Sequence, residues 1–379
     1  MLSILTDRSR IETDWACQRK RYWLTEHQRT GIVPATQHPA LALGIVVHHG
    51  LEEGIKHMHE MDTLGYPETW EMEKTEEWKL LNDDQQDTAR AMVIGFFLTI
   101  WPQWMKQYKP IAVEQEMTMA LDVENYPDLN RLGDGTDQTV TVMARPDLIL
   151  EDKTTGDLWY PDFKTFSNYF DPKRWMWSLQ QQLTMEMAEK NLGRPLAGAW
   201  IQGLSKGSGR RGTIYHALVY GYRHPGAAGV SEPTFGTKRR SGFERFNTKE
   251  YPHGGVEGWI RQLMKKDPEL ITKNFPQSQP LFLQSHLMKE LKQQIYEREN
   301  KIHALQHQAQ FEIGNHIATE KDHMSAFPLN ITQCESIFGR CAYFDACHVN
   351  AIRQDPIGSG AFVPRVPHHA LEREATKKA

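Results

Sequence analysis

The fold is decided by the stretch from Arg145-Pro146-Asp147, through the turn-rich Glu151-Asp152-Lys153-Thr154-Thr155-Gly156-Asp157, to Asp162-Phe163-Lys164-Thr165. The apolar residues within 140–150 and 158–166 predict two β-strands that this turn joins into a hairpin. Residues i and i+2 of a strand share a face, so Asp162 and Lys164 project together while Phe163 points into the core. With the turn centred near Thr154 and Thr155, facing residues have numbers that sum to about 309, which places Asp147 opposite Asp162. One hairpin therefore gathers two carboxylates and an ammonium.

This group of side chains is suited to the hydrolysis of phosphodiester bonds. Such a reaction needs a divalent cation to organise the attacking water and to offset charge on the phosphate. Carboxylate oxygens are ligands for Mg²⁺ or Mn²⁺, and a neighbouring lysine can orient or deprotonate the water. The alternative is a cross-strand salt bridge on the surface of a sheet, because Asp-x-Lys alone is a weak signal.

Helices and further strands are predicted on both sides of the hairpin. The apolar spacing predicts helices at 9–23, 41–56, 78–106, 175–192 and 286–313, and strands at 111–121, 197–204 and 213–222. This order predicts an α/β fold with a mixed sheet flanked by helices. The tail after Arg353, rich in Pro, Gly and Lys, is expected to be loose.

The composition excludes several classes of protein. The chain has 379 residues and a net charge of −4. Its longest apolar run, Ala91 to Trp101, ends at Pro102 and is too short for the ~20 residues of a membrane span. No secretory signal is visible, so we expect a soluble, cytoplasmic protein without a membrane partner. Between Trp200 and Glu250, nine Lys and Arg face three acids; this stretch is either a nucleic-acid-binding surface or a solvated basic loop.

The four cysteines are the second candidate site. Cys334, Cys341 and Cys347 lie close together in the sequence, and Cys17 is far from them. Disulfides are unexpected in a cytoplasmic chain, which leaves a metal site or isolated buried thiols. Four thiolates suit zinc or an iron–sulfur cluster. The absence of a Cys-x-x-Cys knuckle favours iron–sulfur, with a structural role that clamps the N-terminal helix to the C-terminal segment.

The order of the motifs resembles one nuclease superfamily. Gly44-Ile45-Val46-Val47-His48-His49-Gly50-Leu51-Glu52, then Arg145-Pro146-Asp147, Asp162-Phe163-Lys164-Thr165 and a glutamine-rich helix resemble the motifs of PD-(D/E)XK nucleases, above all their RecB-like branch. The cysteine placement resembles the iron–sulfur members of that branch, the AddB helicase-nuclease subunit and the Cas4-like exonucleases, of which phage-encoded ones are nearest in size. The resemblance covers roughly residues 9–200 and 330–350. It implies a restriction-endonuclease-like fold.

The resemblance assigns roles residue by residue. It implies metal ligation by His48 (with His49 as the rival), Asp147, Asp162 and the main-chain carbonyl of Phe163, catalysis by Lys164, a motif glutamine at Gln182, and a [4Fe–4S] cluster on Cys17, Cys334, Cys341 and Cys347. Glu114 and Glu116, on the preceding strand, are second-tier candidates for the metal site.

The sequence departs from the family pattern at two places. Glu186 stands where the family has tyrosine, so Tyr169, Trp175 or Trp177 is a candidate for base stacking instead. Six residues separate Cys334 from Cys341, where the relatives usually have two.

These observations lead to one main hypothesis and two alternatives. The main one is an Mg²⁺- or Mn²⁺-dependent DNA exonuclease of recombination, repair or processing, acting on single-stranded or free-ended DNA, with a possible helicase or recombination partner. The alternatives are a non-catalytic nucleic-acid-binding protein that keeps the nuclease fold, and a zinc-stabilised structural protein. The expected domains are a nuclease core at 1–202, a basic insertion at 203–285, a long helix with the three-cysteine segment at 286–352, and the tail at 353–379.

Overall fold

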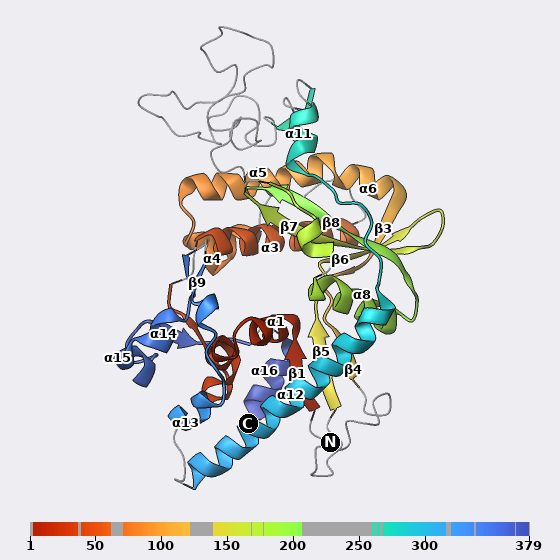
Figure 1. Cartoon of the computed structure of the whole chain (residues 1–379). Helices are drawn as coiled ribbons and strands as arrows, with labels where there is room; N and C mark the ends of the chain where they lie inside the picture. The colour runs from red at the N-terminus through yellow and green to blue at the C-terminus, as the bar shows by residue number, and fades with distance from the viewer. Residues whose placement is uncertain are drawn as a thin grey trace, which may run out of the picture.

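The computed structural model describes residues 3–36, 39–61, 71–121, 139–167, 169–176, 178–206, 260–261, 264–265, 268–315, 320–336, 339–367 and 369–378. These residues form a mixed α/β structure (Figure 1). The strands are β1 Ser3–Asp7, β2 Ile32–Pro34, β3 Tyr108–Val113, β4 Met117–Leu121, β5 Thr139–Ala144, β6 Leu148–Asp152, β7 Leu158–Phe166, β8 Leu196–Ser205, β9 Glu335–Ser336, β10 Gly339–Arg340 and β11 Phe362–Pro364. The α-helices are α1 Arg8–Ala16, α2 Gln18–Arg21, α3 Pro39–Met61, α4 Glu76–Lys79, α5 Asp83–Thr99, α6 Trp101–Gln107, α7 Lys173–Met176, α8 Leu179–Leu192, α11 Pro268–Asn274, α12 Ser285–Gly314, α13 Glu320–Ser325, α14 Phe344–His348, α15 Asn350–Gln354 and α16 Ala370–Lys378.

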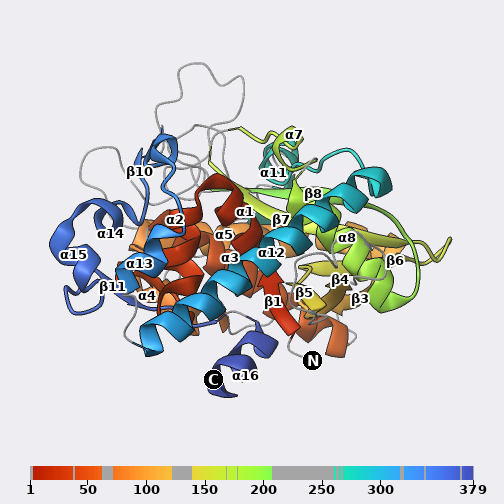
Figure 2. The same cartoon turned by 60° about the horizontal axis from the view of Figure 1, so that its bottom comes forward.

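A four-stranded mixed sheet, in the order β3-β6-β7-β8, carries the predicted hairpin at its centre. Alternate residues of a strand face opposite sides of a sheet. Leu148, Leu150 and Phe163 therefore join a core with α3, α5 and α6 on one side, whereas Ile149 and Tyr160 join a core with α8 and α12 on the other. Figure 2 shows α12 running diagonally past α8. The predicted α/β class with a mixed sheet between helices is confirmed.

The hairpin has the predicted register. β7 covers the predicted range 158–166, and β6 pairs with it so that Leu150 faces Trp159 and Glu151 faces Leu158. The numbers of facing residues sum to 309, as the position of the turn predicts. The Oδ1 atom of Asp152 accepts hydrogen bonds from the backbone of Thr154 and Thr155, and these bonds hold the turn.

Two predicted strands are each bent into two, and the halves belong to different sheets. The range 111–121 contains β3 and β4, which separate at Glu114, and 140–150 contains β5 and β6, which separate at 145–147. β4 and β5 join β1 in a second sheet, in the order β1-β5-β4. Pro146 has no N–H for a strand ladder, and Glu114 has a φ of +46°, in the left-handed region. The Glu114 N–H donates to the Asp147 carbonyl at 3.2 Å, so the two bends lie side by side.

Three predicted helices are interrupted. The range 9–23 breaks at Cys17, whose backbone is extended between α1 and α2. The range 78–106 contains α4, α5 and α6; Asn82 caps α5, and Pro102 lies in the first turn of α6. The range 175–192 divides at Ser178, which caps α8. The apolar pattern continues across these caps, and for that reason periodicity alone does not detect them.

The remaining helix and strand predictions are confirmed where the structure describes the residues. The helices predicted at 41–56 and 286–313 are α3 and α12, and the strand at 197–204 is β8. The strand predicted at 213–222, and the basic stretch beyond Lys206, lie outside the described residues.

The described end of the expected insertion belongs to the sheet. After α11, the chain returns along β8, with Gln277 paired to Gln202 and Leu281 paired to Ala199. Phe275 and Leu281 are buried in the two cores of the sheet. This part of the range 203–285 therefore completes the edge of the four-stranded sheet.

The tail after Arg353 is not loose, which corrects the prediction. β11 pairs antiparallel with β2, and the N-terminus of α16 is capped by the Glu116 carboxylate, which accepts from the Ala370 N–H at 2.9 Å. Glu372 of α16 forms ion pairs with Arg10 and Arg365. Composition predicted a loose segment because β2, Arg10 and Glu116 are distant from the tail in the sequence.

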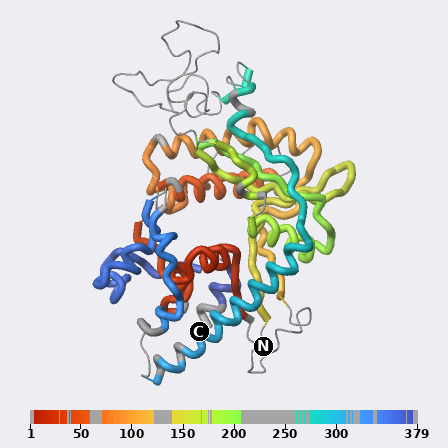
Figure 3. Tube along the Cα trace, in the orientation of Figure 1, coloured from red at the N-terminus to blue at the C-terminus, as the bar shows by residue number. Residues whose placement is uncertain are grey.

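The N-terminal and C-terminal segments share a third core. Trp23 and Ile32 pack there with Phe327, Tyr343 and Phe362, and Figure 3 shows the red and blue ends of the chain side by side. Direct packing therefore holds the two segments together in this core. Among the described helices, none is long and apolar enough to cross a membrane.

Candidate functional site

The two strand bends and α3 bring three metal-ligand side chains together. Glu114 lies at the bend between β3 and β4, Asp147 at the bend between β5 and β6, and His48 in α3. One donor atom from each lies within 4.8 Å of the other two, and His48 Nδ1 is 3.5 Å from Asp147 Oδ1. His49, the rival, instead faces Glu52, with Nδ1 3.7 Å from Oε2. An imidazole with two carboxylates is a donor set that fits a divalent cation such as Mn²⁺ or Mg²⁺.

The charge of Asp147 shifts the pKa values of both Glu114 and His48, and His48 in turn shifts the pKa of Asp147. Burial raises the pKa of Glu114 to about 8, with a further contribution from the charge of Asp147. Burial opposes ionisation of Asp147 too, but His48, the Lys164 charge and the Phe163 N–H together outweigh it and lower the pKa of Asp147 to about 2. Burial would lower the pKa of His48, yet the Asp147 carboxylate raises it overall. A cation with the same ligands would take the place of protons, because metal ligands must be deprotonated.

The two second-tier glutamates have different fates. Glu114 belongs to the triad and also forms an ion pair with Arg145, whose Nε is 2.6 Å from Glu114 Oε2. Glu116 lies away from the triad, where it caps α16 and approaches His369. The left-handed backbone at Glu114 bends the chain before Glu116. The two side chains therefore do not lie on the same face, as residues i and i+2 of one continuous strand would.

Asp162 and Lys164 project together from β7, as predicted. Lys164 Nζ lies 2.6 Å from Asp162 Oδ2. Asp162 is fully buried, and its Oδ1 accepts a hydrogen bond from the Tyr160 hydroxyl at 3.0 Å. Burial raises the pKa of Asp162, against the lowering effect of the Lys164 charge.

The backbone of β7 connects this pair to the triad. The Phe163 N–H donates to Asp147 Oδ2 at 2.7 Å, and the Phe163 ring is buried in the core as predicted. In an extended strand the N–H and C=O of one residue point to the same side, so the Phe163 carbonyl also faces the side of Asp147. The structure therefore brings His48, Asp147, Asp162, Phe163 and Lys164 to one place.

Gln182 does not contact this group. Its Oε1 accepts from the Gln284 N–H at 2.7 Å, and its Nε2 donates to the Phe282 carbonyl at 3.3 Å, so it fixes the chain that leads into α12. Gln180 occupies the place expected of Gln182, with its Nε2 donating to Asp162 Oδ1 at 3.1 Å. Three consecutive glutamines lie in the first turn of α8. Successive residues of a helix point about 100° apart, so the rotation of α8 about its axis determines which glutamine faces the sheet.

Arg8 is a residue of the site that the sequence motifs did not reveal. Its Nη1 donates to Gln180 Oε1 at 2.8 Å from the first turn of α1. Glu186, at the position of the family tyrosine, forms ion pairs with Lys190 and Lys292.

The predicted stacking residues differ in their exposure. Tyr169 is 79% exposed, Trp175 packs against Phe170, and Trp177 lies outside the described residues. Of the two rings that the structure describes, that of Tyr169 is the one exposed to solvent.

The three C-terminal cysteines are arranged around a small hairpin. β9 and β10 pair so that Ser336 faces Gly339 and Glu335 faces Arg340. The Cys341 N–H donates to the Cys334 carbonyl at 2.8 Å, so these two cysteines are cross-strand neighbours. The spacer between Cys334 and Cys341, which is longer than the resemblance implies, therefore contains the paired strands β9 and β10, and their pairing brings Cys341 back beside Cys334.

Cys17 approaches the same place from the break between α1 and α2. Burial raises the pKa of Cys334, and nearby Cys341 and Cys17 add to the effect. Burial also raises the pKa of Cys347 to about 11, with Trp23 and the Arg19 guanidinium opposing it. No three of these sulfurs lie within 4.8 Å of one another among the described residues. The structure gathers the four cysteines without closing them into a compact ligand set.

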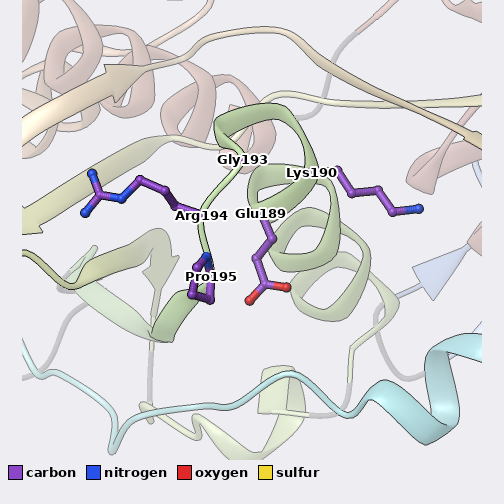
Figure 4. Close-up of a pocket in the computed structure, with 5 residues that line it drawn as sticks. All are labelled: Glu189, Lys190, Gly193, Arg194 and Pro195. Atoms are coloured by element: carbon purple, nitrogen blue, oxygen red, sulfur yellow. The ribbon is translucent and has the colours of Figure 1, made fainter.

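A shallow hollow at the C-terminal end of α8 is separate from both sites. Glu189, Lys190, Gly193, Arg194 and Pro195 line it (Figure 4). Gln180 is near the other end of this 14-residue helix, which spans about 20 Å at 1.5 Å per residue. The Arg194 guanidinium already contacts Gly156 and Glu151, so we assign the hollow no function.

Comparison with known proteins adds no assignment: no model of a known protein family matches the sequence, and no curated protein matches it. The arrangement of the side chains and the order of the motifs are therefore what bears on the function of this chain.

Proposed function

We propose that this protein is a divalent-metal-dependent DNA nuclease with a restriction-endonuclease-like core, related to the RecB-like PD-(D/E)XK enzymes, and that it acts as an exonuclease in recombination, repair or DNA processing. One observation carries the proposal. The His48–Glu114–Asp147 triad lies beside the Asp162–Lys164 pair, joined to it by the hydrogen bond from the Phe163 N–H to Asp147. A surface salt bridge would not require a fully buried Asp162 next to a second acidic cluster.

Each residue has a definable part in this chemistry. His48, Glu114, Asp147, Asp162 and the Phe163 carbonyl would hold Mg²⁺ or Mn²⁺, which supplies charge neutralisation at the phosphate and an acidified water.

The neighbouring residues fix the geometry of the pair on β7. Tyr160 and Gln180 both donate to Oδ1 of Asp162, which leaves Oδ2 directed at Lys164. Lys164 is 20% exposed and can present its ammonium to a phosphate oxygen or to the attacking water.

We propose that the four cysteines hold a structural [4Fe–4S] cluster, in which each thiolate would ligate one iron. A zinc site is the alternative. Arg19, on α2, provides positive charge near Cys17 and Cys347.

The proposed activity can be tested on end-labelled linear and circular DNA with Mn²⁺ or Mg²⁺. We expect the wild type to degrade linear DNA, and Lys164→Ala to reduce the rate by about 100-fold or more. Lys190→Ala is the matched control, because Lys190 is half exposed and lies at the far end of α8; its rate should equal that of the wild type.

Other outcomes separate the alternatives. Degradation that survives Lys164→Ala would reject the assignment of the active site, and cleavage of circles would reject a strict exonuclease. DNA binding without cleavage by the metal-loaded wild type would support the non-catalytic alternative.

A further inference from the structure

A hydrogen-bonded chain links the N-terminal helix to the buried acid of the site. Arg8 Nη1 donates to Gln180 Oε1 at 2.8 Å, and Gln180 Nε2 donates to Asp162 Oδ1 at 3.1 Å. Arg8 is more than 150 residues from Asp162 in the sequence and belongs to no motif of the hairpin. Its other contact is an ion pair with Glu12 at 3.5 Å on the exposed side of α1.

The donor and acceptor groups of Arg8, Gln180 and Asp162 determine the direction of these two hydrogen bonds. A guanidinium has only hydrogen-bond donors, so the group that faces Arg8 must be the amide oxygen of Gln180. The amide NH₂ is then turned toward Asp162. Without Arg8, only the Asp162 carboxylate would still favour this orientation of the amide, and the amide oxygen would have lost its donor.

The orientation of Gln180 matters because Asp162 is fully buried. A buried carboxylate needs donors for its lone pairs, and the loss of one is costly. Tyr160 and Gln180 both donate to Oδ1, and Lys164 faces Oδ2. The two oxygens therefore have separate partners, and Oδ2 is kept on the side of Lys164.

We propose that Arg8 is a positioning residue of the active site: it fixes the Gln180 amide, which in turn fixes the carboxylate of Asp162 with Oδ2 toward Lys164. This inference rests on the proposed function for its consequence in catalysis, but the positioning itself is a property of the metal-free protein. The N-terminal helix thus contributes to the site through a contact with α8.

The first test measures coupling without metal or DNA. Arg8→Leu and Asp162→Asn are combined in a double-mutant cycle, and urea unfolding in EDTA gives the coupling between two residues that do not touch. We expect the coupling to change the unfolding equilibrium constant by more than threefold, and to vanish when the cycle is repeated in Gln180→Leu. Absence of coupling with Gln180 present, or its persistence in Gln180→Leu, would overturn the proposal.

The second test measures Mn²⁺ binding and turnover. Arg8→Leu should weaken Mn²⁺ binding and lower kcat, each about tenfold, which is the effect of one lost hydrogen bond to a charged group. Arg8→Lys, which keeps a donor-only side chain, should recover most of both values. Arg8→Leu combined with Gln180→Leu should be no worse than Gln180→Leu alone.

A control variant, Glu12→Gln, and the competing role of Arg8 as a phosphate-binding residue predict results that differ from those of the positioning role. Glu12→Gln removes the other partner of Arg8 and should leave Mn²⁺ binding and kcat unchanged. A higher KM for DNA in Arg8→Leu, with kcat and Mn²⁺ binding unchanged, would show that Arg8 binds phosphate and would overturn the positioning role. A wild type that cuts no DNA would reject the proposed function, while the coupling cycle would still decide the role of Arg8.

Discussion

Replacing Glu114 with glutamine should stabilise the metal-free protein while it weakens the metal site. Burial and the charge of Asp147 raise the pKa of Glu114 from an ordinary 4.5 to about 8. Below pH 4.5 both the folded and the unfolded chain hold this proton. Between pH 4.5 and 8 the unfolded chain releases it and the folded chain keeps it, so the free energy of unfolding falls as pH rises, and no further loss follows above pH 8.

The size of the effect follows from the same values. Each pH unit in this window costs about 1.4 kcal/mol, so the loss by pH 8 approaches about 5 kcal/mol. Glutamine carries no charge at any pH, but it gives up the ion pair with Arg145, which is one third exposed and worth about 1 kcal/mol or less. We therefore expect Glu114→Gln to raise the free energy of unfolding by up to about 4 kcal/mol at pH 8, and by much less at pH 5.

The assay is urea unfolding in EDTA between pH 5 and pH 9, followed by Mn²⁺ titration of the folded protein. Wild-type affinity for Mn²⁺ should rise with pH until about pH 8, by up to about tenfold per pH unit for each proton displaced, because binding displaces protons from Glu114 and His48. Glu114→Gln should bind at least about tenfold more weakly at pH 8, without the proton released by this carboxyl.

Glu116→Gln is the matched control for this experiment. Residue 116 lies two positions along the same segment, and the glutamine oxygen can still accept from the Ala370 N–H. Its affinity for Mn²⁺ should equal that of the wild type. The reasoning is refuted if Glu114→Gln is less stable than the wild type at pH 8 in EDTA, or if it binds Mn²⁺ with unchanged affinity.

Two further predictions concern packing and the cysteines. Gly54→Ala would place a Cβ on the buried ring of Phe97 and should destabilise the fold by about 1–3 kcal/mol. Gly44→Ala is in the same helix, with the nearest neighbour of its Cβ 3.6 Å away, and should leave the stability unchanged. Thermal unfolding compares the two variants, and equal stability would reject the packing of α3 on α5. Cys341→Ala should give a colourless, poorly soluble protein, checked by absorbance and by iron and sulfide analysis of anaerobically purified samples; a coloured, equally stable variant, or stoichiometric zinc in the wild type, would contradict the proposed cluster.

The sequence predicted the centre of the fold because local rules apply there. The turn at Thr154 and Thr155 sets the register of β6 on β7, and alternation along β7 places Asp162 and Lys164 on one face. These features depend on neighbours in the sequence, which is why a single hairpin could be predicted with the correct pairing.

The features that sequence reasoning missed depend on distant contacts. The bend at Glu114 requires a backbone conformation that a glutamate rarely adopts, and it forms where the Glu114 N–H meets the Asp147 carbonyl. The choice of Gln180 over Gln182 depends on how α8 is rotated against the sheet and on the chain at Phe282. In the tail, β11 is held by its pairing with β2, and no pattern within the sequence of the tail predicts this partner.

The pairing of β2 with β11 also bears on how the protein is made. A growing chain presents β2 long before β11 leaves the ribosome, and Glu116 is also synthesised well before the backbone of α16 that it caps. The early segment carries Arg8 at one end of α1 and Cys17 at the other. Its final packing is therefore completed only after β11 and α16 have been synthesised, so a shorter nascent polypeptide cannot hold the finished arrangement.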